Sequence, residues 1–345
     1  MVQTKMRIPF FKLSFDEREI DEVVRIMRKG YLTQGKEVRM LEKDFSRYVG
    51  SKYAVAVDSC TNGLHLSLLC NGNRWTGDTV TIPSLTFASV ANVIMHSGAK
   101  IDFKDEIVVG RAYYLEHNRP FKVVDSAHQV ERALYHDFRG ALMNFSFYPT
   151  KQISSAEGGM IALNDHYAME WLEKARWHGR KGGGFNYSID MPGYKYNMTD
   201  LQAVIAAVQL RKLDEMNRRR RQIVNYYNRE LNENVESLHL YTISVEDRDS
   251  FIDAMDKVGI NCSVHYYTPL HLQPAYKEFK TCLPLTESTA KHTVSLPLYA
   301  DMRQDEVDYV IKAVKEWRKY EESKHDNMRD GGNRSGVEEG STTSV

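Results

Sequence analysis

Residues 144–160, NFSFYPTKQISSAEGGM, present one lysine shortly after an aromatic run with the pattern of a β-strand. Asn144 to Tyr148 alternate as strand residues do, and Pro149 ends the run because proline cannot donate to a sheet. Lys151 then opens a loop rich in serine and glycine, which leaves space beside its amine. A solvated surface lysine is the more common outcome at such a position. If the amine is instead partly buried, its pKa falls and it can form a Schiff base.

Several short apolar runs end in turn residues, and helical patterns lie between some of them. Strands alternating with helices predict an α/β fold with a mostly parallel sheet. Ligands bind at the carboxyl ends of the strands in such sheets, so the residues that follow each run are candidates for a site. The runs are YAVAVD (53–58), DTVTIPS (78–84), FKVVDSA (121–127) and ALMNFSF (141–147), and the helical patterns are GLHLSLL (63–69) and FASVANVIMHSG (87–98).

The later part of the chain predicts a second, smaller domain. A long helix is expected to begin at Thr199, because TDLQ is a Thr-x-x-Gln capping box and apolar residues follow it at helical spacing. We expect a large domain over residues 1–235, whose N-terminal segment can pack on the small domain, and a small domain over residues 236–322. The polar, glycine- and serine-rich segment 323–345 is predicted to be disordered.

The composition argues against several classes of partner. The chain has 345 residues, with 46 Lys and Arg against 46 Asp and Glu, so no net charge draws it to nucleic acid or to acidic lipid. The four cysteines lack the spacing of a zinc site or of a disulfide framework, which favours a reducing cytoplasm and no metal. No apolar stretch is long enough to span a bilayer, so we expect a cytoplasmic location without membrane contact. The basic run 217–231 is interpreted as a solvated helix surface rather than a nucleic-acid site.

Two further groups of side chains follow predicted strands and could share a ligand with Lys151. Asp125 closes the apolar run FKVVD, and a carboxylate buried there needs a cationic partner such as a protonated pyridine nitrogen. The alternative role of Asp125 is to cap the turn that follows the strand. Phe87 follows another strand end, where it could stack on a flat ring, although packing in the core is the commoner role of a phenylalanine.

A phosphate cradle is predicted where the strand 53–58 passes into a helix. Ser59 and Thr61 stand just before that helix, and free N–H groups at helix N-termini bind phosphate. An ordinary N-cap is the alternative, and Ser146 would add a hydroxyl from the neighbouring strand. Together with the amine, the carboxylate and the aromatic ring, this cradle is the set that pyridoxal 5′-phosphate (PLP) requires.

The segment SFYPTKQISSAEGGM also resembles the cofactor-lysine segment of the DegT/DnrJ/StrS family of PLP-dependent nucleotide-sugar aminotransferases. The resemblance implies the aspartate-aminotransferase-like fold, called fold type I, with a large α/β domain and a smaller C-terminal one. It covers about residues 7–318, and so many blocks in order make a specific signal. Further blocks are GYLTQGKEVRMLEKDFSRYVGSKYAVAVDSCTNGLHLSLL (30–69), GDTVTIPSLTFASVANVIMHSGAKIDF (77–103), VVDSAHQV (123–130), GYKYNMTDLQAVIAAVQLRKLDEMNRRR (193–220) and VHYYTPLHLQPAY (264–276).

The resemblance also implies a role for individual residues. Lys151 would bind the cofactor covalently, Asp125 would pair with the pyridine nitrogen and His128 would lie beside the ring. Residues implied around the rest of the cofactor are Phe87 on the ring and Ser59, Cys60, Thr61 and Ser146 on the phosphate. In GYKYN, either Lys195 or Asn197 would reach the cofactor phosphate of the other subunit of a homodimer. Residues implied at the sugar substrate are Tyr148, Glu157, His265 and Tyr266.

The reaction implied is transfer of an amino group from glutamate to a nucleotide-linked keto-sugar, a 4-keto-6-deoxy hexose. The alternatives are a PLP-dependent sugar dehydratase of the same family, in which histidine replaces the lysine, and a PLP-binding regulator without turnover. Three features depart from the family pattern: Cys60 where glycine is common, GYKYN in place of GYNYR, and a stretch from Phe103 to Asp125 that is about twenty residues shorter than usual.

Overall fold

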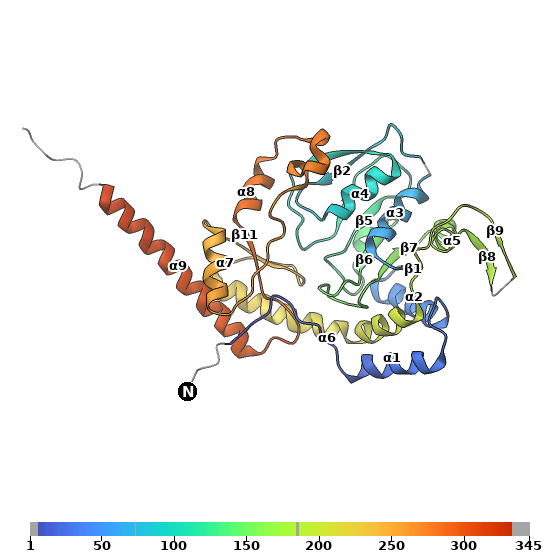
Figure 1. Cartoon of the computed structure of the whole chain (residues 1–345), viewed down its shortest axis with the longest axis horizontal. Helices are drawn as coiled ribbons and strands as arrows, with labels where there is room; N and C mark the ends of the chain where they lie inside the picture. The colour runs from blue at the N-terminus through green and yellow to red at the C-terminus, as the bar shows by residue number, and fades with distance from the viewer. Residues whose placement is uncertain (1–5, 73, 184–185, 333–345) are drawn as a thin grey trace, which may run out of the picture.

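A five-stranded sheet lies at the centre of the first half of the chain (Figure 1). The computed structural model describes residues 6–72, 74–183 and 186–332. The strand order is β1-β7-β6-β5-β4, and β2 pairs with β3 beside it. The strands are β1 (Tyr53–Val57), β2 (Thr79–Pro83), β3 (Lys100–Lys104), β4 (Tyr113–Leu115), β5 (Val123–Asp125), β6 (Leu142–Ser146) and β7 (Gly159–Leu163).

Most strands share one direction, as predicted: β1, β2, β3, β5 and β6 run one way, and β4 and β7 run the other. β5 runs parallel to β6 and β2 parallel to β3, but β1–β7, β6–β7 and β4–β5 are antiparallel. An antiparallel bridge between Thr81 and Glu116 joins β4 to β2, with N–H to O distances of 2.9 and 3.0 Å. Parallel neighbours need a crossover of a dozen or more residues on each side. Residues 105–122 are too few for two crossovers, so β4 turns back antiparallel between β2 and β5.

Helices cover both faces of the sheet, which explains its continuous apolar strands. Ala54 and Ala56 of β1 face a core shared with α2 and α6, whereas Val55 and Val57 face a core shared with α3 and α5. All of residues 142–146 are buried, so β6 does not alternate as predicted, and it ends at Ser146 rather than at Tyr148. The helices of this region are α1 (Glu17–Lys29), α2 (Lys36–Val49), α3 (Cys60–Cys70), α4 (Ala88–Ser97), the 3₁₀ helix η1 (Leu134–Phe138) and α5 (His166–Ala175), followed by the hairpin β8 (Arg180–Gly183) and β9 (Asn186–Ile189).

The long helix α6 (Asp200–Leu231) connects two cores. Its capping box is confirmed: the Thr199 side chain accepts from the Gln202 N–H, and Gln202 reaches back to the Thr199 N–H. Its first half packs on the sheet, and its second half packs in a separate core with Ile8, which pairs with Ile260. Because α6 serves both cores, the boundary placed at residue 235 stays a prediction. The remaining elements are β10 (Tyr241–Ser244), α7 (Arg248–Lys257), η2 (Leu270–Leu272), η3 (Pro274–Phe279), α8 (Pro284–His292), β11 (Thr293–Leu296) and α9 (Gln304–Gly332).

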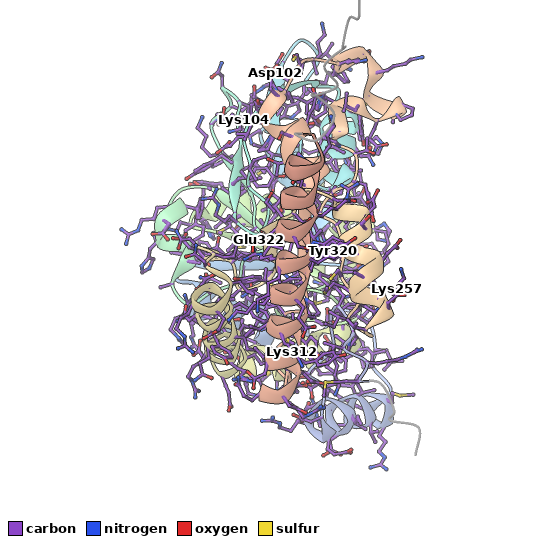
Figure 2. All side chains as sticks on the ribbon, turned by 90° about the vertical axis from the view of Figure 1, so that its left-hand side faces the viewer. Asp102, Lys104, Lys257, Lys312, Tyr320 and Glu322 are labelled. Carbon is purple, nitrogen blue, oxygen red and sulfur yellow. The ribbon has the colours of Figure 1, made fainter. Side chains whose placement is uncertain are left out.

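The last helix, α9, extends beyond the expected end of the ordered chain and projects from the body (Figure 1). Figure 2 shows it in front, with Lys312, Tyr320 and Glu322 along its length. The composition predicts disorder from residue 323, but the helix continues to Gly332, so the prediction is wrong for residues 323–332. That stretch has no proline to stop the helix, and extending a helix that already exists avoids the cost of nucleation. Residues 333–345 lie outside the described part.

A buried ion pair ties α2 to the end of α5 behind the sheet. Arg176 and Glu42 are 2% and 8% exposed and bond to each other, and Glu42 Oε1 also accepts from the Ala56 N–H at 2.9 Å. Arg176 Nη1 donates to the Ala56 carbonyl at 2.6 Å. The pair therefore holds β1 through both the N–H and the carbonyl of Ala56.

Replacing Glu42 by glutamine should destabilise the protein by about 3–5 kcal/mol, because it leaves the Arg176 charge buried without its counter-charge. Chemical denaturation gives the free energy of unfolding. The matched control is Asp44→Asn on the same helix, whose pair with Arg47 is exposed at 3.4 Å and should contribute less than about 1 kcal/mol. Equal effects of the two substitutions would contradict a structural role for the buried pair.

Candidate active site

A cavity of about 450 Å³ opens where β2, β5 and β6 end and α3 begins. Such a volume lies in the range of cofactor and small-molecule sites. Its far wall comes from the C-terminal region, through His239, His265 and Tyr266. Of the predicted site residues, those that line it are Ser59, Cys60, Thr61, Phe87, Asp125, His128, Ser146, Tyr148, Lys151, Glu157, His265 and Tyr266.

Lys151 and Asp125 face this cavity from different segments. Asp125, 6% exposed, ends β5, and its Oδ1 accepts from the Ala127 N–H at 2.9 Å. Lys151 follows a turn in which its own N–H donates to the Tyr148 carbonyl at 2.9 Å. In the described residues, Lys151 and Asp125 interact through their charges and not through a hydrogen bond to each other. The amine and the carboxylate thus share a cavity without neutralising each other directly.

Burial dominates the protonation of both groups. It lowers the pKa of the Lys151 amine, and the negative charge of Asp125 opposes that effect. It raises the pKa of the Asp125 carboxyl, against the Ala127 N–H, the Lys151 charge and the Tyr113 hydroxyl. A cation placed between them would favour the ionised carboxylate, because an opposite charge nearby stabilises it.

The N-terminus of α3 offers a site for an anion. Ser59 caps the helix by accepting from the Asn62 N–H at 3.2 Å, and the earlier N–H groups of the first turn have no partner within the helix. Burial raises the pKa of the Cys60 thiol well above its usual value, so the thiol stays neutral and does not repel an anion. Gly159, which begins β7, is packed against the same turn: an added Cβ would lie 2.6 Å from the Cys60 nitrogen.

Three histidines gather around the amine as neutral rings. Burial lowers the pKa of His128 and His239 well below the usual value, and that of His265 to about 4, with the Lys151 charge adding to each effect. His128 Nδ1 accepts from the Gly110 N–H at 3.3 Å, and the His128 and His239 ring centroids are 4.8 Å apart. His265 Nδ1 bonds to Ser295 Oγ at 2.9 Å.

Aromatic side chains border the cavity on its open side. Phe87 is 61% exposed, and its ring centroid is 6.3 Å from that of Tyr266. A phenylalanine exposed to this degree is not part of the core, which removes the commoner explanation of Phe87. Tyr148 is also exposed and lines the same cavity.

Lys195 and Asn197 lie elsewhere in the chain. Asn197 forms a bridge with Val57 at the end of β1, and Lys195 Nζ donates to Asn197 Oδ1 at 2.5 Å. Neither residue lines the cavity of its own chain. Their predicted service to a second subunit stays a prediction.

Sequence reasoning missed several residues that line the cavity. His239 comes from the small region, and Val108, Arg111 and Tyr113 come from the shortened stretch before β5. The alternation in RAYYLE could have indicated a strand with Tyr113 and Leu115 inward, but it is too short to be distinctive.

Taken together, the fold and the site define a PLP-dependent transferase of fold type I. The chain belongs to the DegT/DnrJ/EryC1/StrS aminotransferase family, whose model matches residues 14–107 and 123–315, and it is a PLP-dependent sugar aminotransferase. The unmatched residues 108–122 fall in the stretch that is shorter than the family pattern.

Relatives of similar length support this assignment. The chain is 32% identical to the spore coat polysaccharide biosynthesis protein SpsC of Bacillus subtilis, over 92% of this chain and 98% of SpsC. It is also 32% identical to the uncharacterized protein MJ1066 of Methanocaldococcus jannaschii, over 89% of this chain and 97% of that protein. The putative sugar aminotransferase Spr1654 from Streptococcus pneumoniae, solved in its PMP form, superposes with a TM-score of 0.79 at 26% identity, covering 89% of this chain and 96% of Spr1654.

The described residues were also compared with the requirements of a metal site and of a membrane span. No group of three or more His, Cys, Asp or Glu side chains among them is arranged to hold a metal ion. Within the same residues, no helix has both the length and the apolar character needed to cross a membrane.

Gly159→Ala should weaken cofactor binding about tenfold or more, because its Cβ would push on the backbone of Ser59 and Cys60, and overpacking typically costs ~1–3 kcal/mol. Titration of the cofactor-free protein with PLP measures the dissociation constant. Gly140→Ala is the control: its φ of 85° makes alanine strained, but nothing lies within 4 Å of the new Cβ. An unchanged dissociation constant for Gly159→Ala would argue against the helix N-terminus as the phosphate site.

Proposed function

We propose that this protein transfers the amino group of glutamate to a keto-sugar carried on a nucleotide, using PLP bound in the cavity described above. The observation that carries the proposal is the arrangement of Lys151, Asp125 and the α3 N-terminus around one cavity, with no direct pair between amine and carboxylate. When bound, PLP supplies an electron sink that stabilises a carbanion next to the transferred nitrogen.

The residues present fit this cofactor. Asp125 is the acceptor for the ring nitrogen, because a buried carboxylate favours a cationic partner. Phe87 offers a ring face, and the neutral His128 lies on the same cavity wall. The residues that would hold the phosphate are Ser59, Cys60, Thr61 and Ser146, next to the first turn of α3.

Lys151 has the properties of a group that moves a proton. Burial lowers the pKa of its amine, so a larger fraction is neutral and able to accept a proton near neutral pH. In the proposed reaction, the amine would take the proton from the α-carbon of the donor and deliver it to the cofactor carbon on the other side of the transferred nitrogen. Asp125 limits this pKa shift, which keeps the amine basic enough to accept the proton.

The open side of the cavity is suited to a large substrate. Tyr148 and Glu157 border it from the Lys151 loop, and His265 and Tyr266 from the C-terminal region. We assign the nucleotide-linked keto-sugar to this side. The sugar aminotransferase family and the polysaccharide role in the name of SpsC support a sugar acceptor.

Two observations favour aminotransfer over the alternatives. A dehydratase of this family has histidine at the lysine position, and this chain has Lys151. A regulator without turnover would have no need of an amine with a lowered pKa, and perturbed groups of this kind cluster at functional sites.

The assigned chemistry can be tested with the purified protein. It should show visible absorption from lysine-bound PLP, and glutamate should bleach this band as the amino group moves to the cofactor. Incubation with glutamate and a panel of nucleotide-linked 3- and 4-keto-sugars should give an amino sugar, with mass and regiochemistry as the readout. Lys151→Ala should abolish both signals, whereas Lys100→Ala, an exposed lysine on β3, should preserve them. Normal turnover by Lys151→Ala would refute the assignment of the amine.

We further propose a homodimer in which Lys195 or Asn197 of one subunit holds the phosphate in the other subunit's site. A mixed dimer of Lys151→Ala with the double variant Lys195→Met/Asn197→Ala tests it. If the residues act across the interface, one of the two sites in the mixed dimer is complete, so activity should return to about half of wild type. The two parent variants should both be impaired. No recovery in the mixed dimer would place these residues in their own subunit's site, and an unimpaired double-variant parent would place them outside any site.

A further inference from the structure

The segment that the family model leaves unmatched supplies a buried tyrosine to the site. Residues 108–122 contain β4, in which Tyr113 pairs with Asp125 of β5 directly across the strands. Tyr113 is 8% exposed, whereas its neighbour Tyr114 faces outward at 37%. Because side chains alternate along a strand, β4 directs Tyr113 to the same side as the Asp125 carboxylate.

A chain of hydroxyl groups ends on that carboxylate. The Tyr113 hydroxyl lies 3.1 Å from Asp125 Oδ2 and 2.7 Å from Thr86 Oγ1. An ionised carboxylate only accepts, so Tyr113 donates to Asp125 and Thr86 donates to the Tyr113 oxygen. Burial, with the Asp125 charge, raises the pKa of Tyr113 well above its usual value, so the hydroxyl keeps its proton. Both Asp125 oxygens are therefore held, one by the Ala127 N–H and one by Tyr113.

We propose that Tyr113 is a positioning residue that orients the Asp125 carboxylate toward the cofactor's ring nitrogen and keeps it ionised. The inference rests on the proposed function, because it assumes that Asp125 receives a protonated pyridine. Tyr113 lies in the stretch that is shorter than the family pattern. In this stretch β4 runs antiparallel to both β2 and β5, which places Tyr113 opposite Asp125.

The physical effect follows from hydrogen bonding to a charged group. A donor to a carboxylate stabilises its ionised form and lowers its pKa. Without the Tyr113 hydroxyl, the pKa of Asp125 rises, so the proton between ring nitrogen and carboxylate is held less firmly on the nitrogen. An unprotonated ring is a weaker electron sink, and the ion pair that binds the cofactor is weakened.

The Tyr113 hydroxyl should also set the pH at which the affinity for PLP is lost. A carboxylate favours cofactor binding above its pKa, and the affinity falls as pH drops through that value. Removal of the Tyr113 hydroxyl raises the pKa of Asp125, so this loss of affinity should begin at a higher pH than in the wild type.

The test is Tyr113→Phe, which keeps the ring and its packing but removes the hydroxyl. PLP titration of the cofactor-free protein from pH 5 to 8 should show a dissociation constant about tenfold higher at neutral pH. Its rise toward low pH should begin earlier than in wild type. With PLP labelled at the ring nitrogen, the nitrogen-15 chemical shift should move toward that of unprotonated pyridine. The kcat should fall while the KM for the sugar stays the same.

Two further variants complete the design. Tyr114→Phe, on the same strand but facing outward, should match the wild type in every readout. Thr86→Val removes the donor to Tyr113 while keeping the Tyr113–Asp125 bond, so it should shift the pH profile in the same direction by a smaller amount. If Tyr113→Phe proves unstable, the pH profile of Thr86→Val tests the proposal in its place.

The outcomes separate this inference from the proposed function. If the wild type binds PLP through Lys151 but Tyr113→Phe leaves the affinity, its pH profile and the nitrogen shift unchanged, the role of Tyr113 is refuted and the proposed function stands. The role of Tyr113 is equally refuted if Tyr113→Phe lowers thermal stability alone. If the wild type shows no Lys151-dependent PLP binding, the proposed function itself fails.

Discussion

A buried carboxylate that faces a lysine without touching it is the constraint on which this site depends. Asp125 is almost inaccessible, and isolated charges are strongly disfavoured in such surroundings. Two donors hold its oxygens, yet burial still raises the pKa of the carboxyl. The strands and loops that carry Asp125 and Lys151 thus leave the carboxylate without a cationic partner and the amine free to react with an aldehyde. PLP, the cofactor of this family, has both a ring nitrogen that can be protonated and an aldehyde.

The surrounding architecture keeps this arrangement in place. Helices on both faces bury β1, β6 and β7, so the strand ends that carry the site have little freedom. The Glu42–Arg176 pair holds β1 just before the turn that leads into α3. The helix α6 then links this core to the one that supplies His239 and His265, so both walls of the cavity share a rigid element.

Much of the candidate site could be predicted because its residues follow local patterns. Lys151, Asp125, Phe87 and Ser59 each come just after a recognisable apolar run, and all four line one cavity. Tyr113 could not be predicted in this way, because β4 is three residues long and its pairing partner is set by the neighbouring strands. For the same reason the alternation of strands and helices predicts the common strand direction but not the reversed direction of β4 and β7. The continuation of α9 past residue 322 could not be predicted from composition, because a segment that extends an existing helix does not have to nucleate one.

The sequence by itself determined the order of strands and helices, the cap of α6 and the family, because these depend on residue type and spacing along the chain. Only the tertiary structure decided the direction of β4, the bond from Tyr113 to Asp125 and the exclusion of Lys195 and Asn197 from their own chain's cavity. Contacts of this second kind join segments that are distant in sequence, and their geometry depends on the packing of the whole sheet rather than on any local pattern.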